Sequence, residues 1–203
     1  MTHLPTPGAV LDYWIGAAAH DALVADEKHK LWFKKSFETD RAISERFLPL
    51  LTALASGLAQ TWAVQAPRAR LAAIIALDQF SRNIFRDNAL AFAHDKLARG
   101  LSKDGLMLGE DAGLSEVEKI FFYIPLEHSE YLPDQDLSVS QYQKLARSSR
   151  QAFKPLVDNT LLYAVKHRDV IRDFGRFPHR NAILKRASTE PEQAYLARPG
   201  SGF

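Results

Sequence analysis

Residues 71–86 read LAAIIALDQFSRNIFR, and this stretch decides the fold. Its first seven residues are all apolar, and the bulky ones recur at the three- and four-residue spacing of a helix. Asp78, Arg82 and Arg86 follow four residues apart, which places them in one row on the same helix. A charged row that continues so apolar a helix is expected to be at least partly buried. Because a buried charge is costly unless it is paired, the row predicts partners elsewhere in the chain.

Helix start signals recur on both sides of this stretch, as capping residues and as prolines in a first turn. The predicted starts are Thr6 with Pro7, Ser36 or Thr39, Pro67, Asp87 or Asn88, Ser115 with Glu118 as a capping box, and Thr189 with Glu192. The helix that begins at Asp87 or Asn88 is predicted to end near Gly100. Pro125 lacks a backbone donor, so it is predicted to kink or break the helix that contains it.

Two further helices are predicted over residues 139–153 and 158–174, the second ending at Gly175. No segment alternates apolar and polar residues over strand length with turn residues at both ends, so no strand is predicted. The sequence therefore predicts an all-α fold of antiparallel helical hairpins, packed as a bundle or a short solenoid. The length suits a single domain over residues 1–203. The residues predicted to lie in its core include Trp14, Trp32, Phe33 and Trp62.

The composition is that of an ordinary globular protein, with 46% hydrophobic and 25% charged residues, and it excludes a disordered chain. Lys and Arg number 26 against 24 Asp and Glu, so the formal net charge is only +2. A nucleic-acid binder that relied on charge would show a clearer basic surplus. The chain has no cysteine, which excludes disulfides, thiolate metal sites and cysteine catalysis.

An uncharged run over residues 47–67 raises the question of a membrane span. The run contains threonine, serine and glutamine, and its bulky residues fall on one stripe of a helix rather than all around it. The amino-terminal residues show neither a basic start nor an apolar stretch of signal-peptide length. We therefore expect no membrane segment and a cytoplasmic protein.

Two more polar clusters interrupt apolar segments further along the chain. Residues 125–130 read PLEHSE, and if the helix resumes after the proline, Glu127 and Glu130 share a face with His128 beside them. Residues 174–181 read FGRFPHRN, in which a helix ends on glycine and a turn presents arginines, a histidine and an asparagine. We expect these two clusters to meet the charged row in space, although they are far apart in the sequence.

The candidate ligand-binding residues are Asp78, Arg82, Glu127, His128, Glu130, Arg176, His179, Arg180 and Asn181. Arginine suits carboxylates and phosphates because its planar guanidinium presents a fork of donors. We expect the three arginines and His179 to hold an anion, while the acidic residues orient those arginines or bind a cationic part of the ligand. The expected partner is an anionic small molecule or a peptide or protein segment, and neither nucleic acid nor a membrane.

Four segments of the chain resemble one bacterial family in the order in which they occur. They are residues 11–16 (LDYWIG), 77–86 (LDQFSRNIFR), 125–130 (PLEHSE) and 174–181 (FGRFPHRN). In these motifs the chain is similar to domain-of-unknown-function family 924, which is grouped with the tetratricopeptide-like helical superfamily. The likeness runs from about Val10 to the closing residues 200–203. It implies an all-α domain of stacked helical hairpins, and it assigns no activity, substrate, cofactor or catalytic residue.

Three other interpretations of the same residues stay open. An enzyme of hydrolase type would use Glu127, His128 and Glu130 as general acid and base, with Arg82 or Arg180 holding an anion. A metal site would combine those three residues with His167 or His179, but no ligand spacing of a recognised type occurs, so we expect no metal and no cofactor. The clusters could also form a purely structural ion-pair network with a role in protein interaction.

Overall fold

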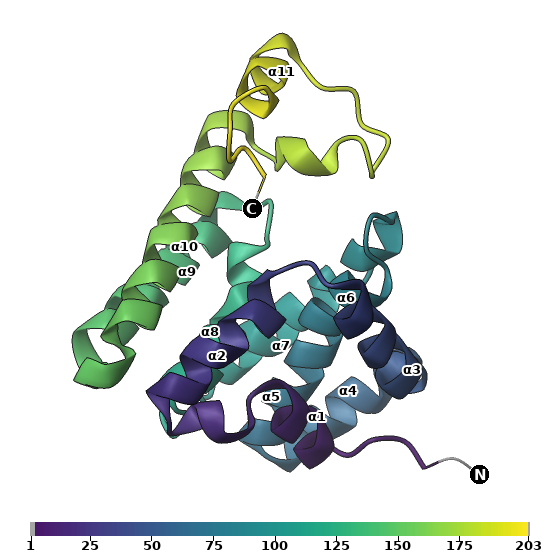
Figure 1. The fold of residues 1–203 in the computed structure, drawn as a ribbon, viewed down its shortest axis with the longest axis vertical. Coiled ribbons are helices and arrows are strands. Elements are labelled where there is room, and N and C mark those ends of the chain that lie inside the picture. The colour runs from purple at the N-terminus through teal and green to yellow at the C-terminus, as the bar shows by residue number, and fades with distance from the viewer. Residues whose placement is uncertain (1–2, 203) are drawn as a thin grey trace.

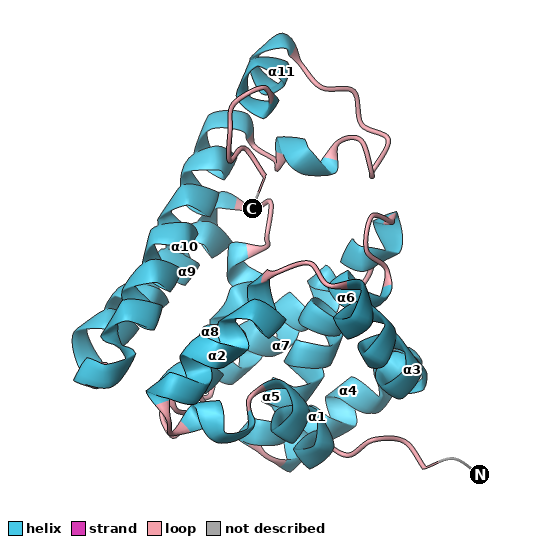
Figure 2. Cartoon of the chain, in the orientation of Figure 1, coloured by secondary structure: helices cyan, strands magenta, loops and turns pink. Residues whose placement is uncertain are grey.

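The computed structural model describes residues 3–202, and within that range the chain consists of helices joined by turns, with no strand (Figure 2). The all-α prediction is confirmed. The helices are α1 (Pro7–Trp14), α2 (Ala22–Phe33), α3 (Phe37–Ala53), α4 (Ala59–Gln65), α5 (Pro67–Ile75), α6 (Ser81–Ile84), α7 (Asp95–Met107), α8 (Glu116–Glu127), α9 (Leu132–Ser148), α10 (Lys154–Phe174) and α11 (Glu190–Leu196). Shorter 3-10 or π-helical turns connect several of them.

Most helix starts lie where the capping residues predict them. The Thr6 hydroxyl accepts from the Ala9 amide at the start of α1, and Ser36 caps α3 in the same way. Complete capping boxes open α8, at Ser115 and Glu118, and α11, at Thr189 and Glu192. Each of these starts depends on residues at most three apart, which is why the sequence alone locates them.

The predicted helix from residue 87 or 88 to Gly100 is wrong at both ends. Asn88 caps only a short 3-10 turn, Ala89–Phe92, and α7 begins afterwards at Asp95. The helix then passes through Gly100 and ends at Met107. A glycine inside a helix costs only about 1 kcal/mol, which packing of the buried face of α7 readily offsets.

Helix α8 does not break at Pro125, but continues for two residues and ends at Glu127. The proline thus stands in the last turn, where it removes only one backbone donor before the helix stops. Glu130 therefore lies beyond the helix, in the turn that leads to α9, and does not share a helical face with Glu127. Helix α9 begins at Leu132, seven residues before the predicted 139, because Pro133 occupies its first turn, where the missing backbone donor costs nothing.

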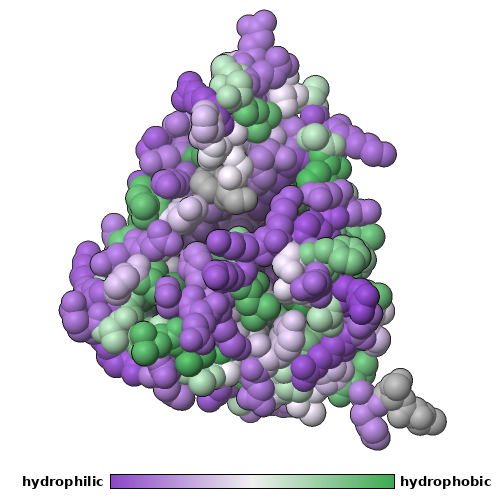
Figure 3. Space-filling model, in the orientation of Figure 1, coloured by the Kyte–Doolittle hydropathy of each residue, from purple (hydrophilic) through white to green (hydrophobic). Residues whose placement is uncertain are grey.

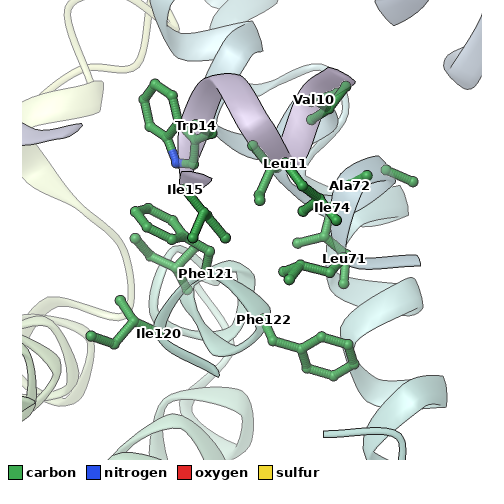
Figure 4. Packing of buried hydrophobic residues seen from close by; sticks show 14 of the residues in the cluster. Val10, Leu11, Trp14, Ile15, Leu71, Ala72, Ile74, Ile120, Phe121 and Phe122 are labelled. Atoms are coloured by element: carbon green, nitrogen blue, oxygen red, sulfur yellow. The ribbon is translucent and has the colours of Figure 1, made fainter. Parts of the chain in front are cut away.

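The core is built around α5, whose residues are buried throughout, from Ala69 onward. Figure 4 shows Leu71 and Ile74 of α5 packed against Leu11 of α1, with Phe121 of α8 close by. The Trp14 ring meets that of Phe121 edge to face, 5.7 Å between centroids. Rings in this arrangement stabilise the packing beyond the area that they bury.

Three of the four aromatic residues predicted for the core are buried, but Phe33 at the end of α2 is 46% exposed. The prediction for Phe33 is wrong because α2 ends there, so that the ring lies at the edge of the core rather than inside it.

Helices α9 and α10 run side by side along one flank of the molecule, and α8 packs against both (Figure 1). After α10 the chain turns at Gly175, which has a positive φ of 69°, and leads to α11. This return places the 3-10 turn Pro178–Arg180 opposite the end of α6 and the turn Ala89–Phe92. Side chains that are distant in sequence therefore surround one space.

One helical stretch in the described part of the chain, Phe37–Gln65, is long and apolar enough to cross a membrane. It includes Pro49 inside α3, and Gly57, whose φ of 124° interrupts the helical path. Of the 18 consecutive residues in this stretch with the highest mean hydropathy, 39% are buried. A core helix of a globular protein passes the same test of length and composition, so one such stretch is weak evidence of a span.

Candidate functional site

A cavity of about 430 Å³ opens between the N-terminal helices, the end of α8, α10 and the turn Pro178–Arg180. Figure 3 shows the molecular surface hollowed near the middle of this face, with hydrophilic side chains around the hollow. The lining combines ionisable side chains with aromatic rings. Its ionisable members include Arg82, Glu127, His128, His167, His179 and Arg180, and its aromatic members include Trp32, Phe33, Phe92 and Tyr163.

Asp78 lies fully buried behind this lining, in the π-helical turn Ala76–Phe80 that continues α5. Such turns are frequent at functional sites. Its carboxylate oxygens lie 2.9 and 3.0 Å from Nδ1 of His128, and Oδ1 lies 3.2 Å from Nη1 of Arg82. Burial alone would raise the pKa of Asp78, but Arg82 and His128 more than offset it and hold the pKa below its usual range. Asp78 is therefore ionised at neutral pH.

This carboxylate fixes the tautomer of His128. An ionised carboxylate only accepts hydrogen bonds, so Nδ1 of His128 carries a proton and donates it to Asp78. Burial, and after it the charge of Arg82, lowers the pKa of His128, which keeps the ring neutral at pH 7. The lone pair of the neutral ring is then on Nε2. His128 thus enters the cavity lining as an imidazole held in one orientation.

Arg82 is fully engaged with acidic partners. Nη1 and Nη2 donate to the two carboxylate oxygens of Asp95 at 2.9 and 3.0 Å, and Nη1 also donates to the backbone carbonyl of Asp78 at 2.7 Å. The next arginine of the row, Arg86, turns instead to Asp40 of α3, with 2.6 Å between Nη2 and Oδ1. The three charged residues Asp78, Arg82 and Arg86 therefore do not form one cluster, because the carboxylate that neutralises Arg86 is Asp40 of α3.

Arg180 is only 6% exposed, and it differs from Arg82 because its ion pair is a single, longer contact of 3.6 Å to Asp95. The guanidinium lies between the rings of Phe92 and Phe177, at 4.6 and 4.5 Å from their centroids. The nearest acidic oxygen belongs to Asp95, at 3.6 Å, and Asp95 is already paired with Arg82. Within residues 3–202, Nε of Arg180 has no hydrogen-bond partner. Burial, followed by repulsion from Arg82, lowers the pKa of Arg180 to about 10.

Glu127 adds a carboxyl group of the opposite character to Asp78. Burial, and after it the charge of Asp78, raises the pKa of Glu127 to about 8, which keeps the group protonated at pH 7. Oε1 lies 3.1 Å from Nδ1 of His167, which also lies 2.8 Å from the Tyr163 carbonyl. Oε2 is buried without a hydrogen-bond partner among the described residues, although the Tyr142 hydroxyl is near enough to lower the pKa in part. A protonated carboxyl group in the lining, Glu127, thus lies near an ionised carboxylate behind it, Asp78.

Comparisons with known proteins place the chain in a family. Residues 10–200 match the family described as bacterial protein of unknown function (DUF924). The chain belongs to the DUF924 family. A solved structure of a protein of unknown function from Agrobacterium tumefaciens is 34% identical to this DUF924 protein, with a TM-score of 0.75, over 90% of this chain and 98% of that chain. A search of curated proteins finds no match. The family prediction is confirmed, and the tetratricopeptide-like grouping stays a prediction.

Besides Asp78, three of the candidate residues of this DUF924 protein lie outside the cavity lining. Glu130 accepts from both terminal nitrogens of Arg186, at 2.7 and 2.9 Å, and from the Phe177 amide at 2.8 Å. Arg176 forms a two-pronged pair with Glu192 at 2.6 and 2.8 Å. These residues were expected to meet a ligand, but the structure places them in the support of the C-terminal turn.

Asn181 belongs to the same support. Its amide nitrogen donates to Ser188 at 3.0 Å, and its oxygen accepts from Nε of Arg186 at 3.0 Å. These hydrogen bonds hold the segment that follows the turn Pro178–Arg180. Asn181 does not line the cavity, and its contribution is to fix the position of the turn that carries Arg180.

The expectation that the three clusters meet is confirmed. Asp78 contacts His128, Glu130 contacts the backbone of Phe177, and Arg180 reaches Asp95, which is paired with Arg82. Of the nine candidates, the cavity lining includes Arg82, Glu127, His128, His179 and Arg180, with Asp78 directly behind it.

The sequence did not reveal the role of Asp95 or of the aromatic pair around Arg180, whereas His167, considered with Glu127 only as a metal ligand, does lie beside Glu127. The only signal for Asp95 is its position at the start of a helix, which any capping residue shares. His167 stands on the buried face of α10 and resembles a core histidine in sequence.

No metal centre is evident in the part of the chain that the structure describes, residues 3–202, because it contains no group of three or more His, Cys, Asp or Glu side chains that could hold an ion. Ser129, the serine beside His128, donates to Asp134 at 2.9 Å and accepts from Arg99 at 3.0 Å. Its hydroxyl is therefore committed to a different pair of helices.

Proposed function

We propose that this DUF924 protein binds a small organic anion in the cavity, with the carboxylate or phosphate of the ligand on Arg180. The observation that carries the proposal is the buried guanidinium of Arg180, which lies against two aromatic rings and lacks a close carboxylate of its own. A buried cation is costly unless it is paired and hydrogen-bonded. A bound anion would supply the missing acceptors.

The contrast with neighbouring arginines supports this role. Arg82 and Arg186 each make two hydrogen bonds to one carboxylate, which is the arrangement that a structural ion-pair network requires. A purely structural interpretation fits them well. It fits Arg180 less well, because Nε of this guanidinium has no hydrogen-bond partner among the described residues and Nη1 has only the 3.6 Å contact with Asp95.

The size and lining of the cavity favour a small molecule over a peptide segment. Small-molecule sites have volumes of roughly 300 to 1,000 Å³, and the cavity of about 430 Å³ lies toward the lower end of that range. Such sites combine apolar and aromatic walls with a few polar groups that orient the ligand. Here Trp32, Phe33 and Tyr163 supply the walls and Arg180 the charge.

The test is a titration of the purified protein with acetate, benzoate and inorganic phosphate, followed by calorimetry and by the fluorescence of Trp32 in the cavity wall. We expect at least one anion to bind and to raise the melting temperature, since a ligand at 100 times its Kd stabilises the folded state by about 2.7 kcal/mol. Arg180→Gln should lose the binding.

The matched control is Arg172→Gln, which removes an exposed arginine of α10 that pairs with Asp169. It should bind the anion like the wild type. Absence of binding for all three anions, or binding that Arg180→Gln retains, would overturn the proposed function.

A further inference from the structure

The cavity holds a base and an acid beside the open arginine, and this suggests chemistry as well as binding. Resting on the proposed function, we propose that the protein catalyses enolisation of a small 2-oxo carboxylate. His128 would remove a proton from the carbon next to the carbonyl group, and Glu127 would donate a proton to the carbonyl oxygen. The carboxylate of the substrate would bind Arg180.

The base is Nε2 of His128. Its orientation is set from behind, because Nδ1 is held by the two oxygens of Asp78 at 2.9 and 3.0 Å. A histidine whose Nδ1 proton is directed at a carboxylate is held in one orientation and one tautomer, and its neutral Nε2 is available as a base at pH 7. His128 lines the cavity, and because Nδ1 faces the buried Asp78, Nε2 is on the opposite side of the ring from that carboxylate.

The acid is the carboxyl group of Glu127, the residue before His128 in the same turn. Nδ1 of His167 donates to the Tyr163 carbonyl at 2.8 Å and lies 3.1 Å from Oε1 of Glu127, while Oε2 has no hydrogen-bond partner among the described residues. The rings of His128 and His167 are 6.3 Å apart, so the acid and the base belong to one part of the cavity. General acids work best when their pKa lies near the working pH, and the raised pKa of Glu127 meets that condition.

The third group of the proposed site is Arg180, which would bind the carboxylate of the substrate. Arg180 packs on Phe177, whose ring is 5.5 Å from that of His167. The open guanidinium therefore adjoins the same group of side chains as the acid and the base. With the carboxylate held there, the neighbouring carbonyl and its adjacent carbon would reach Glu127 and His128.

The proposed step balances without any further reactant. The C–H bond breaks, its electron pair forms the C=C bond, and the C=O π electrons take the proton of Glu127 as an O–H bond. His128 ends protonated and Glu127 ends as a carboxylate. The reverse transfers, or exchange with solvent, restore both groups.

Proton transfer is favoured over covalent catalysis because the hydroxyls of Ser129 and Thr160 are hydrogen-bonded to other groups. The Ser129 hydroxyl donates a hydrogen bond to Asp134, and the Thr160 hydroxyl in the cavity lining donates one to the Leu156 carbonyl at 2.9 Å. An acid, a base and an anion anchor are sufficient for enolisation, which needs no side-chain nucleophile.

The experiment follows exchange of the hydrogens next to the carbonyl group of pyruvate, 2-oxobutyrate and phenylpyruvate in D₂O by proton NMR. We expect the wild-type protein to accelerate exchange of at least one probe tenfold or more over buffer. His128→Gln and Glu127→Gln should each reduce the acceleration tenfold or more, while His20→Gln, at an exposed position before α2, should leave it unchanged.

Benzoate gives a second test that needs no variant, because it carries a carboxylate but no hydrogen that can enolise. It should suppress the exchange in the wild type if both anions bind Arg180. This keeps the proposal testable if a buried substitution prevents folding, which circular dichroism of each variant would reveal.

The outcomes separate the two proposals. Anion binding that depends on Arg180, without exchange of any of the three probes, would overturn the enolisation proposal and leave the proposed function standing. Exchange that His128→Gln does not slow, or that benzoate does not suppress, would also overturn it. If none of the carboxylates or phosphate binds, both proposals fail.

Discussion

The buried carboxylate of Asp78 holds Nδ1 of His128 at 2.9 Å across 50 residues of sequence. The contact joins the π-helical turn after α5 to the end of α8, and Arg82 stands on the other side of the same carboxylate at 3.2 Å. Asp78 thus neutralises an arginine and orients a histidine at once. The neutral His128 tautomer in the cavity is a consequence of this single buried charge.

Asp78→Asn should change the tautomer as well as the stability. An amide can donate to Nδ1, so the proton of His128 should move to Nε2 in the variant. The protein should lose about 3 kcal/mol of unfolding free energy, because Arg82 loses part of its buried countercharge. Nitrogen-15 NMR of the imidazole and urea unfolding measure the two effects. A wild-type ring protonated on Nε2 would contradict the assignment.

Arg180→Met should leave the stability of the free protein within about 1 kcal/mol of the wild type, or increase it. Replacing an incompletely paired buried charge by an apolar side chain of similar size removes a desolvation cost. Arg176→Met is the comparison, because Arg176 holds the carboxylate of Glu192 and is expected to destabilise when removed. Urea unfolding of both variants decides. A larger loss in Arg180→Met than in Arg176→Met would show that Arg180 braces the fold.

Gly105→Ala should destabilise the protein by about 1–3 kcal/mol, because the added Cβ would lie 2.5 Å from Cζ of Phe122 and 2.8 Å from Cδ of Arg70. Gly100→Ala on the same helix α7 meets nothing within 4 Å and should stabilise by up to about 1 kcal/mol. In thermal unfolding, the melting temperature should fall in Gly105→Ala and rise in Gly100→Ala. Equal shifts would contradict the close packing at Gly105.

Glu127→Gln should remove a pH-dependent loss of stability. The unfolded chain releases this proton near pH 4.5, whereas the folded protein keeps it up to about pH 8. Between these values the folded state holds more protons, so its stability falls as the pH rises. Relative to the wild type, Glu127→Gln should gain on the order of 2 kcal/mol or more between pH 5 and pH 8.

Urea unfolding at the two pH values measures this gain, with Glu45→Gln as the control at an exposed position of α3. An equal pH dependence in the wild type and in Glu127→Gln would mean that Glu127 is already ionised in the folded protein.

Most helix starts, and the burial of the charge at Asp78, can be predicted from local patterns in the sequence. Caps such as Ser36 and the box at Ser115 act over three residues, so their effect can be predicted without knowledge of the fold. The apolar run before Asp78 likewise predicted that the charge would be buried and paired. The ends of α7 and α8 are harder to predict. Packing of the buried face stabilises each helix by more than a single glycine or proline destabilises it, so the helix continues past that residue.

Only the tertiary structure decided which charges face the cavity. Arg176 and Arg180 are four residues apart in the sequence. Arg176 forms an ion pair with Glu192, whereas the guanidinium of Arg180 lies between the rings of Phe92 and Phe177. Both arginines have the same chemistry, and the partner of each comes from a different part of the chain. Whether a charge is paired or open depends on distances between helices, which no local pattern in the sequence encodes.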